Sequence, residues 1–171
     1  MMTFIFIGKR GFVRVLLILC LLSAGAACAD VLRGMVVGVH DGDTITVWNG
    51  QANERIRLSG IDAPETKQPF GAVSKRNLSD LVFGKEVDVE WSKRDRYKRI
   101  VGKVMIAGKD ACLEQIRAGV AWWYREYAKE QPVADRRSYE DAENSAKSQR
   151  RGLWVDADPT APWDWRHAKR R

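Results

Sequence analysis

Apolar and polar residues alternate along much of the first two thirds of the chain, which is the pattern of half-buried β-strands. Between Thr44 and Val47, for example, threonines alternate with Ile45 and Val47. The dipeptide Asn49-Gly50 follows, and it is a strong signal for a tight hairpin because both residues tolerate positive φ. We therefore predict strands over residues 35–39, 44–47, 55–58, 87–91 and 100–106.

Three segments have the features of helices. Leu78, Leu81 and Val82 fall at helical spacing, and Gly84 is placed to end that helix. Asp110 is a suitable N-cap for a second, short helix. The predicted helices span residues 70–83, 110–118 and 134–151. Five short strands with a helix after the third predict an α+β, mainly β protein: a five-stranded OB-fold barrel with three helices.

The two ends of the chain differ from this domain. Residues 1–29 have a basic start, a short apolar run and the small-residue sequence Ala27-Cys28-Ala29, the pattern of a cleaved secretory signal peptide. An uncleaved anchor and lipid attachment at Cys28 are the alternatives, but the apolar run is short for a membrane span. We predict a domain over residues 30–158 and a basic, tryptophan-containing tail over 159–171. The mature protein is then exported, periplasmic or secreted, without a membrane span and monomeric.

Charge and cysteine content narrow the picture only slightly. The net charge of +7 includes Lys9, Arg10 and Arg14, so it falls to +4 without the first 29 residues. A mild positive charge favours a polyanionic partner but is weak evidence alone. Loss of Cys20 and Cys28 would leave Cys112 alone, which excludes an internal disulfide and a cysteine-based zinc site.

Carboxylates stand at the ends of predicted strands, where a buried structural role is unexpected. Asp43, Asp62 and Glu65 come within reach of one another if those strands pair. Oxygen ligands of this kind suit a hard cation such as Ca²⁺. Phosphodiester hydrolysis places negative charge on phosphorus, and guanidinium groups such as those of Arg57 and Arg99 stabilise it. The residues alone thus indicate a metal-assisted phosphodiesterase site.

Three motifs in this order resemble the staphylococcal nuclease (thermonuclease) family. They are Asp41-Gly42-Asp43-Thr44, then Arg57-Leu58 with Ile61-Asp62 and Pro64-Glu65-Thr66, then Asp95, Tyr97 and Arg99. The resemblance covers about residues 34–154, and three linked motifs are far more specific than one.

The resemblance implies a calcium-dependent nuclease that hydrolyses DNA and RNA to products with 3′-phosphates. Asp43, Asp62 and the backbone carbonyl of Ala63 would be the Ca²⁺ ligands. Glu65 would be the general base or would position the water, and Arg57 and Arg99 would bind the phosphate. Substrate contacts would come from Tyr97, Lys98, Trp122 and Tyr124.

The chain departs from the family pattern at three of these positions. Ala63 replaces a threonine, which leaves a backbone carbonyl ligand intact. Lys98 replaces the usual glycine before Arg99 and can change how that arginine is presented. Trp122 replaces a tyrosine, and an indole can stack on a base but lacks the phenol hydroxyl.

Two other functions remain open from the sequence. One is a non-catalytic OB-fold module that binds nucleic acid, although such a module has no need of Asp43, Asp62, Glu65, Arg57 and Arg99 together. The other is an envelope protein of DNA uptake or conjugation, in which cleavage is secondary. The sequence does not distinguish DNA from RNA as the preferred substrate, or endonucleolytic from exonucleolytic cleavage.

Overall fold

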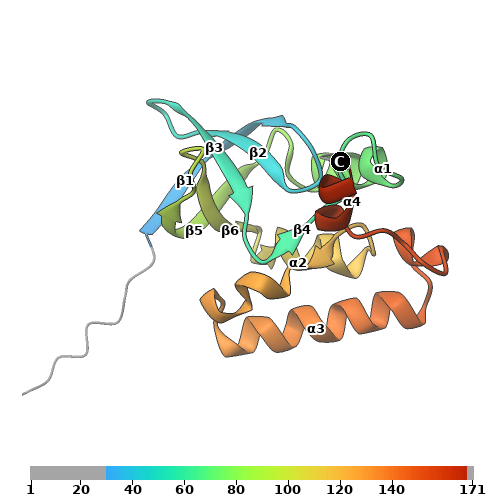
Figure 1. Ribbon diagram of the computed structural model, residues 1–171. Coiled ribbons are helices and arrows are strands. Elements are labelled where there is room, and N and C mark those ends of the chain that lie inside the picture. The colour runs from blue at the N-terminus through green and yellow to red at the C-terminus, as the bar shows by residue number, and fades with distance from the viewer. Residues whose placement is uncertain (1–29, 169–171) are drawn as a thin grey trace, which may run out of the picture.

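The computed structural model describes residues 30–168, and Figure 1 shows a β-barrel next to a layer of helices. Five strands in this part of the chain form the barrel: β1 (Asp30–Val39), β2 (Thr44–Trp48), β3 (Asn53–Leu58), β5 (Glu86–Arg94) and β6 (Ile100–Ile106). Four of their pairings are antiparallel, and a parallel pairing of β3 with β6 closes the barrel. The predicted mainly β, OB-type barrel is confirmed.

Alternation of side chains along each strand fills the barrel. Along β6, every second residue from Ile100 to Ile106 is buried, and the residues between them are only partly covered. Gly102 shares the buried face, and a Cβ at this position would lie 2.5 Å from Val89 on β5. The absence of a side chain there leaves room for the Val89 side chain of the neighbouring strand.

The three predicted helices are present within a few residues of their expected bounds. They are α1 (Gly71–Val82), α2 (Ala111–Arg117) and α3 (Val133–Ser148). The Asp110 carboxylate caps α2 by accepting hydrogen bonds from the amides of Cys112 and Leu113, and it also accepts one from the Tyr139 hydroxyl at 2.7 Å. The start of α2 is thereby tied to α3.

Several short elements were not expected from the sequence. They are β4 (Ile61–Asp62), β7 (Lys109–Asp110), β8 (Trp122–Trp123), the 3₁₀ helices η1 (Arg125–Glu130) and η2 (Gly152–Val155), and α4 (Pro162–Ala168). Strand β4 pairs antiparallel with β8, which places Asp62 opposite Trp122. Helix α4 lies within the predicted tail, and Figure 1 shows it next to β4 rather than projecting from the domain.

The predictions about membrane spans and about the signal peptide concern different parts of the chain. No helix within residues 30–168 is long and apolar enough to cross a membrane. The predicted signal peptide, residues 1–29, lies outside the described residues.

Candidate active site

The loop between β1 and β2 carries Asp43 and is held from both sides. The Asp43 amide donates to the Asp41 carboxylate at 3.0 Å, which forms a tight turn. The side-chain amide of Gln115, a fully buried residue of α2, donates to the Gly42 carbonyl at 2.7 Å. A Cβ at Gly42 would collide with Ser74 of α1, so a glycine is required for this close approach. Helices α1 and α2 therefore fix the position of Asp43.

Arg57 connects the first two predicted acidic residues. Its Nη1 lies 2.6 Å from an Asp43 carboxylate oxygen, and its Nη2 lies 2.9 Å from an Asp62 oxygen. The two carboxylate side chains are 9% and 1% exposed, and that of Arg57 is 16% exposed. The register explains the first contact, because Arg57 lies opposite Thr44 in the β2–β3 pair. Three residues that the sequence predicted to act together are thus in direct contact.

Burial and charge act in opposite directions on these groups. Burial raises the pKa of Asp43 to about 7 even though Arg57 opposes this effect, and the nearby Asp41 and Asp62 add to the rise. Burial alone would lower the pKa of Arg57, but Asp43 and Asp62 outweigh it and the pKa is raised. A cation close to Asp43 favours the ionised form of this carboxylate.

The segment after β4 completes the acidic group. The Ala63 amide donates to an Asp43 oxygen at 2.7 Å, which joins the two acidic loops. The Glu65 amide donates to the Gln68 side chain at 3.1 Å, and Gln68 in turn donates to the Thr160 carbonyl at 2.6 Å. The Glu65 carboxylate is 42% exposed, unlike those of Asp43 and Asp62, so solvent reaches it.

Arg166 was not among the predicted site residues, but it lies on α4 and contacts two of the acids. Its Nη2 is 2.7 Å from an Asp62 oxygen, and its Nη1 is 2.9 Å from a Glu65 oxygen. Partial burial would lower the pKa of Arg166, but hydrogen bonds to Asp62 and Glu65 raise it. Two arginines therefore link three carboxylates in the order Asp43, Arg57, Asp62, Arg166 and Glu65.

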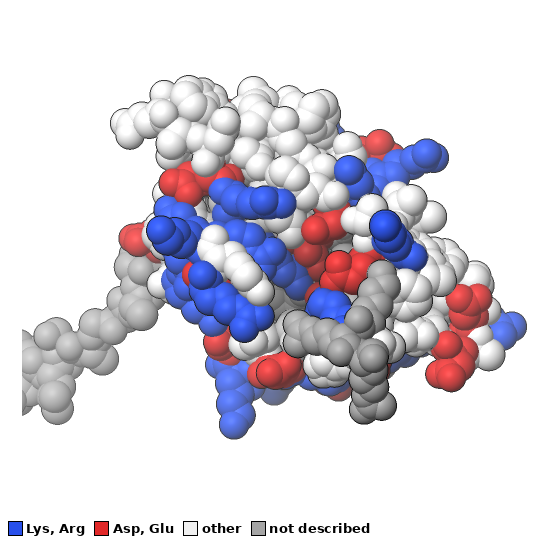
Figure 2. Space-filling model, turned by 45° about the horizontal axis from the view of Figure 1, so that its top comes forward, with Lys and Arg blue, Asp and Glu red and all other residues white. Residues whose placement is uncertain are grey.

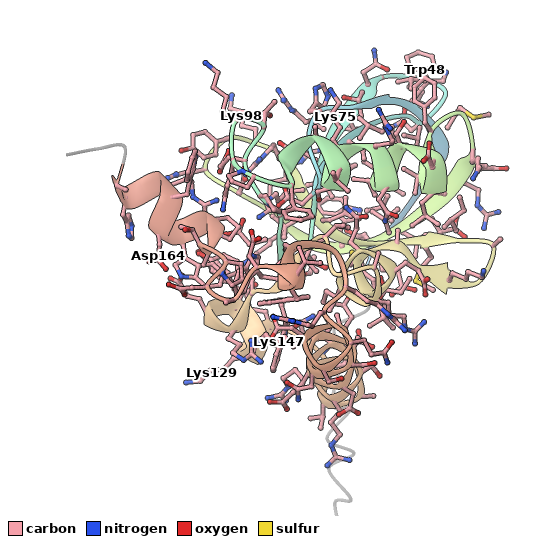
Figure 3. All side chains as sticks on the ribbon, turned by 90° about the vertical axis from the view of Figure 1, so that its right-hand side faces the viewer. Trp48, Lys75, Lys98, Lys129, Lys147 and Asp164 are labelled. Atoms are coloured by element: carbon pink, nitrogen blue, oxygen red, sulfur yellow. The ribbon has the colours of Figure 1, made fainter. Side chains whose placement is uncertain are left out.

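Arg99 is placed on a tight loop between β5 and β6. The Asp95 carboxylate accepts hydrogen bonds from the amides of Tyr97 and Arg99 and from Arg99 Nε. Lys98 has a φ of 63°, the left-handed conformation that glycine adopts readily. The loop thus keeps the shape that the replaced glycine would favour. In Figure 3, Lys98 lies on the same side of the molecule as Asp164 on α4. No contact in the described residues joins Arg99 to the acids.

Aromatic residues predicted to contact substrate line a neighbouring pocket. The pocket has a volume of about 280 Å³ and includes Trp122, Tyr124, Lys147 and Trp163. The rings of Tyr124 and Trp163 are parallel, with centroids 5.5 Å apart, while Trp122 packs edge-on against Trp154 and Trp163. Tyr97 is outside this pocket and is 64% exposed. The predicted substrate residues are therefore divided between the pocket and the Arg99 loop.

The site offers donors of the type that hard cations prefer, without a preformed cage. Asp43 and Asp62 present carboxylate oxygens close together, as their shared contacts with Arg57 show. Within the part of the chain that the structure describes, no three His, Cys, Asp or Glu residues are gathered as a metal site. The chemistry of the donors fits Ca²⁺, but arginines share the same oxygens.

Figure 2 shows acidic side chains near the middle of one face, with many Lys and Arg side chains around them. A surface of this kind attracts a polyanion toward the acids by electrostatic steering. Two features of the site, Arg166 and Gln115, had no signal in the sequence, because each acts through contacts more than 70 residues away. Trp163 had only the weak signal of a tryptophan-containing tail.

Comparison with known proteins gives a consistent result. The family model described as "Staphylococcal nuclease homologue" matches residues 55–156. An "Uncharacterized endonuclease" of Escherichia coli is 46% identical over 154 residues, covering 90% of this chain and 96% of that protein. A "Micrococcal nuclease" of Shigella flexneri is 42% identical over 153 residues, with 84% and 85% covered. An "Uncharacterized endonuclease" of Haemophilus influenzae is 37% identical over 156 residues, with 91% and 83% covered. With its barrel and its group of acids and arginines, the chain belongs to the staphylococcal nuclease family.

Proposed function

We propose that the protein is a Ca²⁺-dependent phosphodiesterase that hydrolyses DNA and RNA and leaves 3′-phosphate ends. Family membership supports the nuclease function and nucleic-acid substrates. The observation that carries the proposal is the contact of Arg57 with both Asp43 and Asp62, beside a solvent-exposed Glu65. A site that only bound nucleic acid would gain nothing from buried acids, because they repel phosphate.

Asp43 and Asp62 would hold the metal, together with the backbone carbonyl of Ala63. When bound, Ca²⁺ would offset negative charge on the scissile phosphate. It would also offset the repulsion between two neighbouring buried carboxylates. Burial is the main cause of the raised pKa of Asp43, and Asp62 adds to the rise.

The remaining steps belong to the side chains. Glu65 accepts a proton from a water molecule, whose oxygen forms a bond to phosphorus while the bond from phosphorus to the 5′-oxygen breaks. The 5′-oxygen is protonated from solvent, and the phosphate stays on the 3′ side. Arg57 and Arg99 donate hydrogen bonds to phosphate oxygens as charge develops on them. Asp95 engages only the Nε–Nη2 edge of Arg99, which leaves Nη1 to meet a phosphate.

Substrate bases would stack in the aromatic pocket. Tyr124 and Trp163 present parallel rings there, and base stacking on such rings tolerates every base. Trp122 would form one wall of the pocket, and Tyr97 and Lys98 would contact the strand near Arg99. This arrangement supports a nuclease with little base preference.

We also propose that the protein acts outside the cytoplasm. The support is the N-terminal pattern of residues 1–29, with a basic start, an apolar run and Ala27-Cys28-Ala29. The location of an epitope-tagged chain in fractionated cells tests this proposal directly, since export predicts a processed form outside the cytoplasmic fraction.

The decisive experiment is cleavage of single-stranded DNA, duplex DNA and RNA by the purified protein, with CaCl₂ or with EGTA. We expect calcium-dependent cleavage with 3′-phosphate ends, and a loss of about 100-fold or more in kcat for Glu65→Gln. Glu140→Gln on the exposed face of α3 is the matched control and keeps full activity. Binding without cleavage under all metal conditions would instead favour a non-catalytic OB-fold module.

A further inference from the structure

Arg166 occupies the carboxylate oxygens on which the proposed metal site depends. Its Nη1 lies 3.2 Å from Asp62 Oδ1, and its Nη2 lies 2.7 Å from Asp62 Oδ2. The same Nη1 lies 2.9 Å from Glu65 Oε1. Both oxygens of Asp62 are therefore bound by one guanidinium group, which also reaches the proposed general base.

The surroundings of Asp62 make this contact strong. The Asp62 side chain is 1% exposed and lies in a group of three carboxylates with Asp43 and Glu65. Arg57 also donates a hydrogen bond from Nη2 to Asp62 Oδ1, at 2.9 Å. Charge-assisted, two-pronged contacts of this type are among the strongest hydrogen bonds in proteins, and burial weakens the competition from water. A metal ion that uses Asp62 as a ligand must compete with this side chain.

Helix α4 carries Arg166 to the site without being part of the barrel. Strand pairing does not hold this helix to either sheet of the described chain. Its position depends on side-chain packing: Trp163 stacks on Tyr124 and meets the edge of Trp122, and Pro162 is buried. The preceding segment is tied down where Gln68 donates to the Thr160 carbonyl. Arg166 can therefore leave Asp62 while the barrel remains intact.

We propose that Arg166 is the resident counter-ion of Asp62 and Glu65, and that a divalent cation and this side chain compete for Asp62. Helix α4 thereby sets the metal affinity of the site. Without metal, the guanidinium holds the Asp62 and Glu65 carboxylates in place. With metal bound, Asp62 exchanges Arg166 for the cation, and α4 loses its main polar anchor. The inference rests on the proposed function, since it takes Asp62 as a metal ligand.

Titration calorimetry with CaCl₂ alone, without nucleic acid, tests the competition. We expect Arg166→Ala to bind Ca²⁺ about tenfold or more tightly than the unchanged protein, because the competing cation is gone. Arg166→Lys keeps the charge but loses the fork of donors, so its affinity falls between the two. Arg33→Ala is the matched control: Arg33 makes a similar two-pronged contact with Asp88 on an exposed part of the barrel and is not bonded to Asp43, Asp62 or Glu65 in the described structure. Its affinity stays within about twofold of the unchanged protein.

The competing outcomes are distinct. Equal affinities for Arg166→Ala and Arg33→Ala overturn this inference and leave the proposed nuclease function standing. Weaker binding by Arg166→Ala also overturns it, since Arg166 would then support the metal site. An absence of calcium binding in every variant, with cleavage that needs no calcium, overturns the calcium assignment and this inference together.

A second measurement on the unchanged protein covers the case in which Arg166→Ala fails to fold. Amide hydrogen exchange of residues 163–168 is compared with and without saturating CaCl₂. Release of Arg166 from Asp62 predicts faster exchange in α4 when calcium is present, while the amides of β6 are unaffected. Unchanged exchange in α4 upon calcium binding overturns the inference.

Discussion

Asp95 binds Arg99 through both the backbone and the side chain of that arginine, at 3.0 Å to the amide nitrogen and 2.8 Å to Nε. The same carboxylate accepts the amide of Tyr97, so one acid shapes the loop and orients the guanidinium. Because the amide contacts need an acceptor of this geometry, Arg99 depends on Asp95 for its position. The loop and the proposed phosphate ligand form a single unit.

Stability supplied by Asp95 depends on pH in a defined direction. Burial opposes ionisation of Asp95, but hydrogen bonds from Arg99 and Tyr97 outweigh it and lower its pKa below the usual 3.8. A carboxylate with a lowered folded-state pKa stabilises the fold above its unfolded pKa and loses this effect as the pH falls through the folded value. We expect the Tm difference between the unchanged protein and Asp95→Asn to be constant above about pH 5 and to shrink below pH 3.8. A difference that stayed constant to the acid limit would contradict the assignment.

Replacement of Lys98 by glycine tests the strain in this loop. Lys98 has a φ of 63°, a conformation that costs a residue with a side chain about 1 kcal/mol relative to glycine. Lys98→Gly is therefore expected to raise the free energy of unfolding by up to about 1 kcal/mol in urea titration. Lys75→Gly in the exposed part of α1 is the control and lowers it by about the same amount, since glycine disfavours a helix.

The cap of α2 makes a separable contribution to stability. Asp110→Ala removes the acceptor of the Cys112 and Leu113 amides and the partner of the Tyr139 hydroxyl. We expect a loss of about 2 kcal/mol in the free energy of unfolding. Tyr139→Phe removes only the hydroxyl contact and costs about 1 kcal/mol. Equal losses in the two variants would mean that the cap itself contributes nothing.

Glu143 on α3 binds three of the residues that line the aromatic pocket. It is fully buried and accepts hydrogen bonds from the Trp123 amide at 3.0 Å and from Arg125 and Lys147, both at 2.8 Å. Glu143→Gln leaves two cations without their counter-ion and is expected to weaken binding of single-stranded DNA severalfold, with a loss of stability of about 2 kcal/mol. Fluorescence anisotropy and urea unfolding measure the two effects. Glu140→Gln on the same helix changes neither.

Burial makes the thiol of Cys112 unreactive. The side chain is fully buried, and burial raises its pKa well above the usual 9.0. Because the thiolate is the reactive form, we expect negligible modification by a thiol reagent in native buffer and complete modification in urea. Rapid modification of the native protein would show that α2 opens readily.

The sequence predicted the barrel well because its strands are long enough for alternation to be visible. Four of the barrel strands and helices α1, α2 and α3 appear close to their predicted bounds, whereas β1 begins at Asp30 instead of residue 35. Strands β4 and β8 escaped prediction because two residues carry no periodicity. Helix α4 has seven residues, as α2 does, but its start was not marked by an N-cap of the kind that Asp110 gives α2, and it lies in a segment interpreted as a basic tail.

The site residues that lie in sequence motifs were predicted, and Arg166, which is placed by packing of a distant helix, was not. Asp43, Asp62, Glu65 and Arg57 were identified as a group because they lie in linked motifs, and the structure brings them together. Arg166 could not be identified, since it is 104 residues from Asp62 and one arginine among several in its segment. Contacts set by packing of distant elements leave no spacing rule in the sequence.

Closure of the barrel has a consequence for the order of folding. Arg57 lies on β3, which reaches its final place only when it pairs in parallel with β6, and Arg166 comes from the last described helix. Non-local pairing of this kind is a slow event in folding. The acids and arginines therefore meet late, once β6 and α4 have both joined the fold. A chain that stops short of β6 holds no assembled group of acids and arginines.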